Sequence, residues 1–236
     1  MKLTIAQTGV PPEALRADWP GYSEMFQTMF EAAGLSFTIR VVDVENGETL
    51  GDPEPGEALL VTGSRKGVYE GHNFIEPLEA SVRHYAEAGA PVVGICFGHQ
   101  LVAQAFGGTV EKSDRGWGVG VHTYELLKDA PGAPSVPRFA CAVSHQDQVT
   151  SLPEDFVRLA GSVFTPFGVL AHQTKPVLTF QMHPEFTHGF AEALMRSRAD
   201  SIPQDRMEMG LATLQNTTDR QLIAEWIGSF LLDQTK

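Results

Sequence analysis

An apolar run that leads directly into a glycine-flanked cysteine constrains the fold of this chain more than any other feature. Residues 91–95 read Pro-Val-Val-Gly-Ile, and Cys96, Phe97 and Gly98 follow before a helix-forming segment. Gly94 and Gly98 stand two residues either side of Cys96, the spacing of a nucleophile elbow, where a cramped strand-to-helix turn excludes neighbouring side chains. A small buried cysteine at the end of a core strand is the alternative, and the paired glycines favour the elbow.

A cysteine in such an elbow lies at a helix N-terminus, where the helix dipole and backbone N–H groups favour its thiolate. A nucleophile of this kind needs a base, and the base needs an orienting partner. Residues 176–182 read as a strand that delivers His183 and Glu185 at its tip, with Pro184 restricting the geometry between them. A surface turn explains an isolated His-Pro-Glu triplet, whereas beside the elbow it indicates that Glu185 fixes the tautomer of His183.

With these motifs the chain resembles the class I, triad-type glutamine amidotransferases. Three blocks carry the resemblance: Gly-x-Cys-x-Gly-x-Gln at residues 94–100, His-Pro-Glu at residues 183–185, and Leu-Leu-Val-Thr-Gly-Ser-Arg at residues 59–65. The resemblance implies that Cys96 attacks the side-chain carboxamide of glutamine and that Gln100 helps to hold the substrate. It further implies that the histidine of the second block is the base and that the glutamate is its orienting partner.

The block at residues 59–65 is the expected oxyanion loop, because attack on a carbonyl creates a negative oxygen that needs preplaced N–H donors. We assign the backbone N–H groups of Gly63 and Phe97 to this role. The sequence Gly-Ser-Arg stands where family members often have two glycines and a proline, as in a free-standing branch near GMP synthase glutaminase domains and γ-glutamyl peptidases. Thr-Gly-Ser after a strand is also ordinary turn chemistry, which is the alternative interpretation.

Residues 142–149 resemble a family stretch that lines the pocket for the α-amino and α-carboxylate groups of the glutamyl substrate. Ser144, Gln146 and Asp147 are therefore candidate substrate contacts, and the Asp147 carboxylate suits the substrate ammonium. In the competing interpretation, His145 and Asp147 merely terminate a strand with side-chain hydrogen bonds.

These residues together predict a glutamine amidotransferase-type cysteine hydrolase that cleaves a small-molecule γ-glutamyl amide through a γ-glutamyl thioester. A glutaminase subunit would pass ammonia to a synthetase partner, and no synthetase domain is recognisable in the chain. The alternatives are a stand-alone γ-glutamyl peptidase or amine hydrolase without an ammonia acceptor, and a non-catalytic regulatory module on the same fold. A regulatory module predicts a broken triad, whereas all three residue types are present. A related cysteine-hydrolase or chaperone-like group shares a similar elbow but lacks the strand-end His-Pro-Glu block.

The order of apolar runs predicts an α/β fold: a mostly parallel central sheet with helices on both faces and an antiparallel edge. By resemblance this is the flavodoxin-like class I amidotransferase fold. The expected strands are residues 2–7, 37–44, 58–61, 92–95 and 176–182, and the expected helices are residues 22–33, 74–88, 101–106, 190–198 and 222–232. Residues 46–57 are expected to be loop. Short strands between residues 109 and 180, broken at 107–108 and 129–137, should form the antiparallel edge, and a polar stretch with Pro203 separates the last two helices.

Length and charge bound the remaining properties. The 236 residues suit one domain over residues 1–236, with a helical C-terminal extension from about residue 187 that caps the site, docks a partner or forms a homo-oligomer. The formal net charge of −12 argues against a nucleic-acid surface. Neither a signal peptide nor a membrane span is recognisable, and two cysteines give no disulfide framework, so we expect a cytoplasmic protein. The eight histidines do not cluster at ligand spacing, and no nucleotide-binding glycine pattern occurs, so no metal or cofactor is expected.

Overall fold

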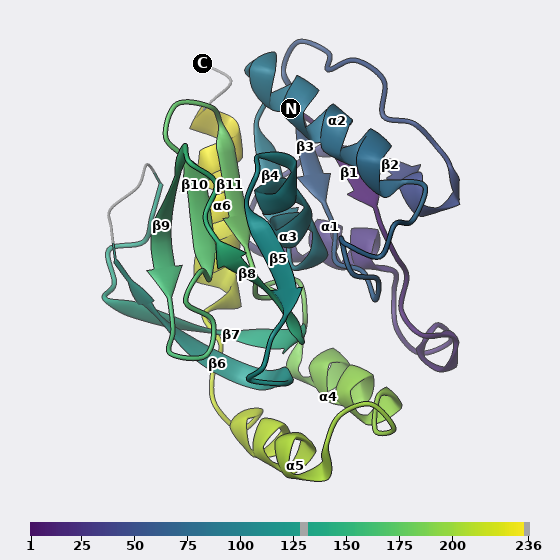
Figure 1. The fold of residues 1–236 in the computed structure, drawn as a ribbon, viewed down its shortest axis with the longest axis vertical. Helices are drawn as coiled ribbons and strands as arrows, with labels where there is room; N and C mark the ends of the chain where they lie inside the picture. Colours follow the sequence, from purple (N-terminus) through teal and green to yellow (C-terminus); the bar gives the residue numbers. More distant parts are fainter. Residues whose placement is uncertain (128–131, 234–236) are drawn as a thin grey trace.

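A mixed β-sheet forms the centre of the computed structural model, which describes residues 1–127 and 132–233 (Figure 1). In the described part this sheet has nine strands, in the order β2-β1-β3-β4-β11-β10-β9-β6-β7, and β5 pairs with β8 in a separate two-stranded sheet. The strands are β1 (Lys2–Gln7), β2 (Thr38–Asp43), β3 (Glu57–Val61), β4 (Val92–Ile95), β5 (Thr109–Lys112), β6 (Gly118–Leu126), β7 (Arg138–His145), β8 (Asp147–Ser151), β9 (Phe156–Gly161), β10 (Val169–His172) and β11 (Val177–Phe180).

The half of the sheet from β2 to β11 is parallel, and the half from β10 to β7 is antiparallel. Strands β3, β4 and β11 are buried throughout, as expected for parallel strands covered on both faces. The predicted fold class is therefore confirmed.

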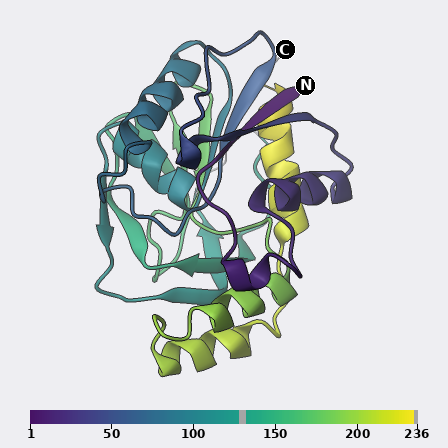
Figure 2. The same ribbon diagram turned by 90° about the vertical axis from the view of Figure 1, so that its right-hand side faces the viewer.

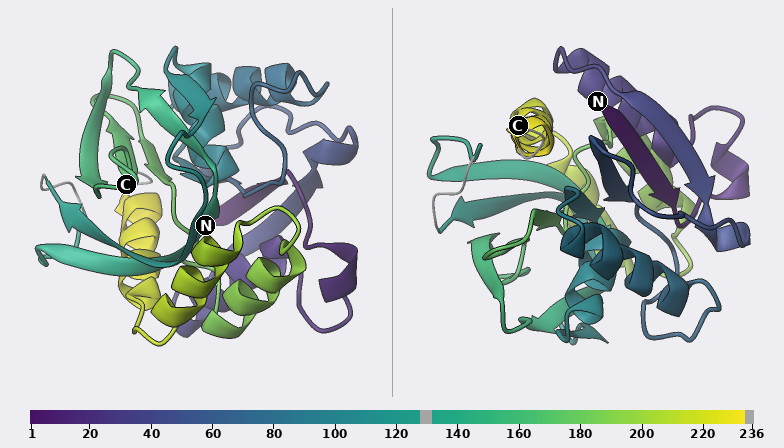
Figure 3. Two further views of the ribbon diagram at one scale, coloured as in Figure 1. Left: turned by 60° about the horizontal axis from the view of Figure 1, so that its bottom comes forward. Right: turned by 90° about the horizontal axis from the view of Figure 1, so that it is seen from above.

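Helices cover both faces of the sheet (Figure 3). The helices are α1 (Tyr22–Ala32), α2 (Ile75–Glu87), α3 (Phe97–Ala105), α4 (His188–Ser197), α5 (Gln204–Thr213) and α6 (Arg220–Asp233), with short 3₁₀ turns η1 (Glu13–Leu15) and η2 (Val44–Asn46). Helices α1 and α6 pack together on one face, and α2 and α3 pack on the other. The fully buried Trp226 of α6 packs edge to face against Phe180 of β11, with ring centroids 5.1 Å apart, so this helix belongs to the core.

The parallel strands deliver their carboxyl ends to one end of the molecule, where α4 and α5 also lie (Figures 1 and 2). Ligands of open α/β sheets bind at this end of the strands. The N-terminus and the end of α6 lie toward the opposite end of the molecule, because α6 runs back along the sheet from the α4–α5 end. No helix in the described ranges has the length and apolar character needed to cross a membrane.

Three expectations about individual elements were wrong. Helix α3 begins at Phe97 and not at residue 101, because the chain turns into the helix directly after Cys96. Helix α5 occupies the stretch after Pro203 that was expected to separate two helices; only its Gly210 is fully buried, so it carries little hydrophobic periodicity. Not all of the short strands expected at the antiparallel edge lie there: β5 and β8 form their own sheet. Strand β11 lies parallel to β4 inside the main sheet. The break expected at residues 129–137 lies partly outside the described residues.

Candidate active site

The turn at Cys96 has the strained geometry of a nucleophile elbow. Cys96 has φ 52° and ψ −100°, and no other non-glycine residue in the described ranges has positive φ. Strain of this kind costs about 1–3 kcal/mol and is maintained only where the surroundings enforce it. They do so here, since a Cβ on Gly94 would lie 2.5 Å from the Gly98 carbonyl oxygen, and one on Gly98 would overlap the Val61 carbonyl. The two glycines thus allow β4, α3 and β3 to approach closely enough to form the turn.

The elbow places Cys96 at the N-terminus of α3, on the wall of a cavity of about 220 Å³. The Cys96 N–H donates to the Phe180 carbonyl at 2.8 Å, which fixes the turn to β11. The next N–H, that of Phe97, belongs to the first turn of α3, where backbone donors have no partner within the helix. A nucleophile and an available backbone donor therefore lie side by side.

His183 and Glu185 form a buried pair beside the cysteine. The Nδ1 of His183 donates to Oε1 of Glu185 at 2.7 Å, and the His183 ring stacks on Phe186 with a centroid separation of 4.0 Å. Burial lowers the pKa of His183, but the charges of Glu185 and Cys96 outweigh it and raise that pKa to about 10. A protonated imidazole at neutral pH favours the thiolate form of a neighbouring cysteine.

Backbone contacts fix the His-Pro-Glu segment. The His183 N–H donates to the Ala142 carbonyl at 2.9 Å, and Arg220 of α6 donates to the carbonyls of Pro184 and Glu185 at 3.1 and 3.3 Å. The sequence analysis missed Arg220, because its contact joins residues 35 positions apart and no local motif marks it.

The predicted oxyanion loop lies against the histidine. A Cβ on Gly63 would lie 2.9 Å from Cε1 of His183, so a glycine is needed there. The Gly63 carbonyl accepts a hydrogen bond from Oγ1 of Thr8 at 3.1 Å. In a trans peptide the N–H of the next residue points away from that carbonyl, so the Ser64 N–H is directed away from Thr8. Ser64 lines the same cavity as Cys96.

All four predicted substrate contacts line the cavity with Cys96. Nε2 of Gln100 donates to the Asp147 carbonyl oxygen at 2.9 Å, so Gln100 supports the residue that carries the predicted ammonium contact. The Asp147 carboxylate accepts from the Tyr69 hydroxyl at 2.9 Å, and burial raises the pKa of Asp147. Ser144 accepts from Nη1 of Arg198 at 2.8 Å, and Gln146 lines the same cavity. The alternative strand-end hydrogen bond is also present, between His145 Nδ1 and the Asp147 carbonyl at 3.1 Å.

Further charged and aromatic side chains complete the cavity wall. Those that the sequence analysis did not select are Arg65, Lys66, Tyr69, Glu70, Lys112, Trp117, His145, Arg198 and Ser201. Arg65 is the last residue of the predicted oxyanion block and Tyr69 follows it closely, so that block could have suggested both. Arg198 and Ser201 come from the region after the His-Pro-Glu segment, which therefore contributes to the cavity.

The described residues contain no group of three or more His, Cys, Asp or Glu side chains that could hold a metal ion. Cys141, the second free cysteine, is fully buried within β7, and burial raises the pKa of its thiol well above the ordinary value. Cys96 is thus the cysteine positioned for chemistry.

Comparison with known proteins agrees with the motifs. A family model described as "Glutamine amidotransferase class-I" matches residues 20–198. The glutamine-hydrolysing GMP synthase of Wolinella succinogenes is 36% identical over 160 residues, which are 64% of this chain and 28% of that protein. One separate subunit of the glutamine-hydrolysing GMP synthase of Methanococcoides burtonii is 30% identical over 149 residues, 63% of this chain and 74% of that subunit. The match therefore spans less than a third of the longer relative.

The fold is shared with a solved glutamine amidotransferase from Thermotoga maritima. The TM-score is 0.75 at 18% identity, and the alignment covers 100% of this chain and 98% of the other. At this identity the likeness concerns the fold alone.

Proposed function

Because the chain belongs to the class I glutamine amidotransferases and resembles GMP synthase glutaminases, we propose that it hydrolyses a γ-glutamyl amide through a thioester on Cys96. The observation that carries this proposal is the strained elbow at Cys96 beside the His183–Glu185 pair, with Nδ1 and Oε1 2.7 Å apart. Cys96 lies on the cavity wall, and His183 behind it interacts with both Cys96 and Glu185, as a base between a nucleophile and an orienting carboxylate must.

In the proposed first step the Cys96 thiolate attacks the γ-carbonyl carbon and forms a C–S bond. The negative oxygen of the tetrahedral intermediate accepts from the Phe97 N–H and from the N–H groups at the Gly63–Ser64 segment. The predicted donor is that of Gly63, and the Thr8 hydrogen bond to the Gly63 carbonyl adds that of Ser64. The C–N bond then breaks, and His183 gives its proton to the departing amine.

In the second step His183 takes a proton from water, which attacks the thioester and releases glutamate and the free thiolate. Glu185 stabilises the imidazolium that is present before the first proton transfer and is formed again in the second step, and it keeps Nδ1 protonated. The Asp147 carboxylate binds the α-ammonium group of the substrate, Gln146 and Gln100 complete the surrounding wall, and Ser144 lies on the part of the wall that holds Arg198.

The fate of the amine separates two forms of this function. The curated relatives are GMP synthases, one of them a separate chain of a multisubunit synthase, which favours a synthetase partner that accepts ammonia. The fixed orientation of the Gly63–Ser64 peptide by Thr8 within this chain favours action without a partner. We infer the stand-alone form. We further infer one domain over residues 1–236, because its last helix is part of the core. We infer that the protein acts in the cytoplasm, where its two unpaired cysteines stay reduced.

The test is release of glutamate and amine by the purified chain, with L-glutamine compared with γ-glutamyl peptides and amines. We expect turnover of at least one γ-glutamyl compound and its abolition in Cys96→Ser with the fold unchanged by circular dichroism. Undiminished turnover in Cys96→Ser would refute the mechanism. Turnover only after addition of a synthetase subunit would refute stand-alone action and keep the chemistry.

A further inference from the structure

Two arginines, Arg65 and Arg198, line the cavity that contains Cys96. Nη1 of Arg198 donates to the neutral hydroxyl of Ser144 at 2.8 Å, and its guanidinium lies over the Trp117 ring, 5.8 Å from the centroid. Arg65 lines the same cavity. Within residues 1–127 and 132–233, neither arginine forms an ion pair with a carboxylate. A guanidinium carries five N–H donors, so most of those on Arg198 remain available for a ligand.

The surroundings disfavour this unpaired positive charge. Burial lowers the pKa of Arg198 and the like charge of Arg65 acts in the same direction, whereas the nearby Tyr22 and Cys96 groups raise that pKa without cancelling the effect of burial. A bound carboxylate would offset both effects, and the planar guanidinium matches a carboxylate with two parallel hydrogen bonds. This part of the wall is therefore suited to an anion.

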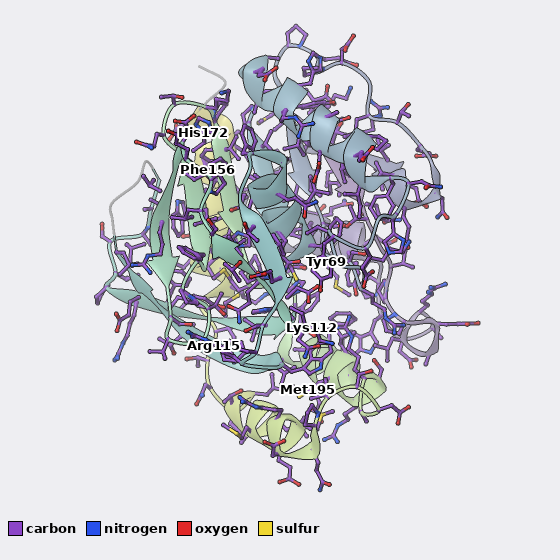
Figure 4. The ribbon with its side chains drawn as sticks, viewed as in Figure 1. Tyr69, Lys112, Arg115, Phe156, His172 and Met195 are labelled. Carbon is purple, nitrogen blue, oxygen red and sulfur yellow. The ribbon has the colours of Figure 1, made fainter. Side chains whose placement is uncertain are left out.

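A second group of side chains in the cavity differs from the arginines, because it carries both a negative and a positive charge. Asp147 accepts from Tyr69 and interacts electrostatically with Lys112, and all three line the cavity. Tyr69 and Lys112 are labelled in Figure 4 near the end of the sheet that faces α4. The head of a glutamyl group carries an ammonium and a carboxylate, so a site with Asp147 and Lys112 supplies a partner for each charge.

The Arg198 group then remains for the other half of the substrate. We propose that Arg198, with Ser144 and Trp117 around it, binds a carboxylate on the departing amine, so that the substrates are γ-glutamyl amino acids or γ-glutamyl peptides. Glutamine itself, whose leaving group is ammonia, gains nothing from this contact. The inference rests on the proposed function, since it assigns the two halves of the substrate to different groups of side chains on the cavity wall.

Three substrates and one matched pair of variants test the assignment. γ-Glutamylglycine carries the leaving-group carboxylate, γ-glutamylethylamide lacks it, and glutamine releases only ammonia. We expect the unmodified chain to prefer γ-glutamylglycine, and Arg198→Gln to lower its kcat/KM by roughly 10- to 100-fold while changing the other two by less than about 3-fold. Arg196→Gln is the control, because Arg196 lies in the last turn of α4, two residues before Arg198, and pairs with Glu192 on the surface.

An equal loss on all three substrates would overturn the assignment, since Arg198 would then act on the thiolate or on the glutamyl head. Ser144→Ala provides a second variant of the same subsite and should lower kcat/KM for γ-glutamylglycine selectively, by a smaller factor.

Calorimetry on Cys96→Ser separates the subsite from the chemistry. We expect γ-glutamylglycine to bind this variant more tightly than γ-glutamylethylamide, and the difference to disappear when Arg198→Gln is added. Equal binding of the two ligands would overturn the subsite even if turnover occurs. Preferential binding with no turnover by the unmodified chain would preserve the subsite and refute the proposed function.

Discussion

Replacing Thr8 with valine should impair catalysis without disturbing the shape of the fold. Thr8 is fully buried just after β1, and its hydroxyl lies 3.0 Å from the Thr62 carbonyl and 3.1 Å from the Gly63 carbonyl. Valine has the same shape but cannot donate. The peptide between Gly63 and Ser64 then loses the contact that directs its N–H away from Thr8.

Two magnitudes set the size of the effect. A buried carbonyl left without a partner costs about 1–3 kcal/mol, and the lower half applies here because the Thr62 hydroxyl lies 3.3 Å from the Gly63 oxygen. Loss of one oxyanion donor costs about 2.7–4 kcal/mol, or roughly 100- to 1000-fold in kcat. The smaller of these two energies, about 1–2 kcal/mol, limits how far the peptide reorients, so we expect kcat to fall roughly 5- to 30-fold. The KM should hardly change, because an oxyanion contact acts in the transition state.

The assay is steady-state hydrolysis of the best γ-glutamyl substrate, with urea unfolding measured on each variant. Thr4→Val is the matched control: Thr4 is equally buried on β1 and its hydroxyl donates to Glu57, away from the cavity. We expect both variants to lose stability, only Thr8→Val to lose kcat, and Thr8→Ser to recover most of it. Equal kcat in the two valine variants, or an effect confined to KM, would refute the reasoning.

Three further results are expected. His183→Ala should slow alkylation of Cys96 by iodoacetamide at pH 7, because the imidazolium that favours the thiolate is lost. An unchanged rate would show that His183 does not promote ionisation of the Cys96 thiol. Burial raises the pKa of Asp147, and only the ionised carboxylate binds an ammonium, so KM should rise as pH falls through that raised pKa. Asp147→Asn should abolish this pH dependence. A KM of the unmodified chain that stays constant through mild acid would argue against the contact. Gly98→Ala should destabilise by more than about 2 kcal/mol in urea, because its methyl group overlaps the Val61 carbonyl, and a loss below about 0.5 kcal/mol would contradict the close packing.

The features that the sequence predicted well are those encoded by neighbouring residues. The expected strands at residues 2–7 and 92–95 agree with β1 and β4, because continuous apolar runs bounded by turns mark buried strands. The elbow was recognisable because its glycines lie within two residues of Cys96, where the backbone itself demands them. The roles of Cys96, His183 and Glu185 in catalysis remain predictions that the variants above test.

The features that the sequence did not reveal depend on contacts between distant parts of the chain. Thr8 contacts Gly63 of the predicted oxyanion loop, 55 positions away, and Arg198 contacts Ser144, 54 positions away. Neither residue belongs to a local motif, so only the folded chain brings them to the cavity. Helix α5 was missed for a related reason: only Gly210 of this helix is fully buried, and a largely exposed helix leaves little hydrophobic pattern.

The most direct test of the central claim is to trap the γ-glutamyl thioester. The purified chain is mixed with its best γ-glutamyl substrate, quenched in acid within one turnover, digested and analysed by mass spectrometry. The account predicts one glutamyl group on the peptide that carries Cys96, a greater yield in His183→Ala if deacylation slows more than acylation, and no adduct in Cys96→Ser. Steady turnover with no adduct on Cys96, together with activity in Cys96→Ser, would contradict it.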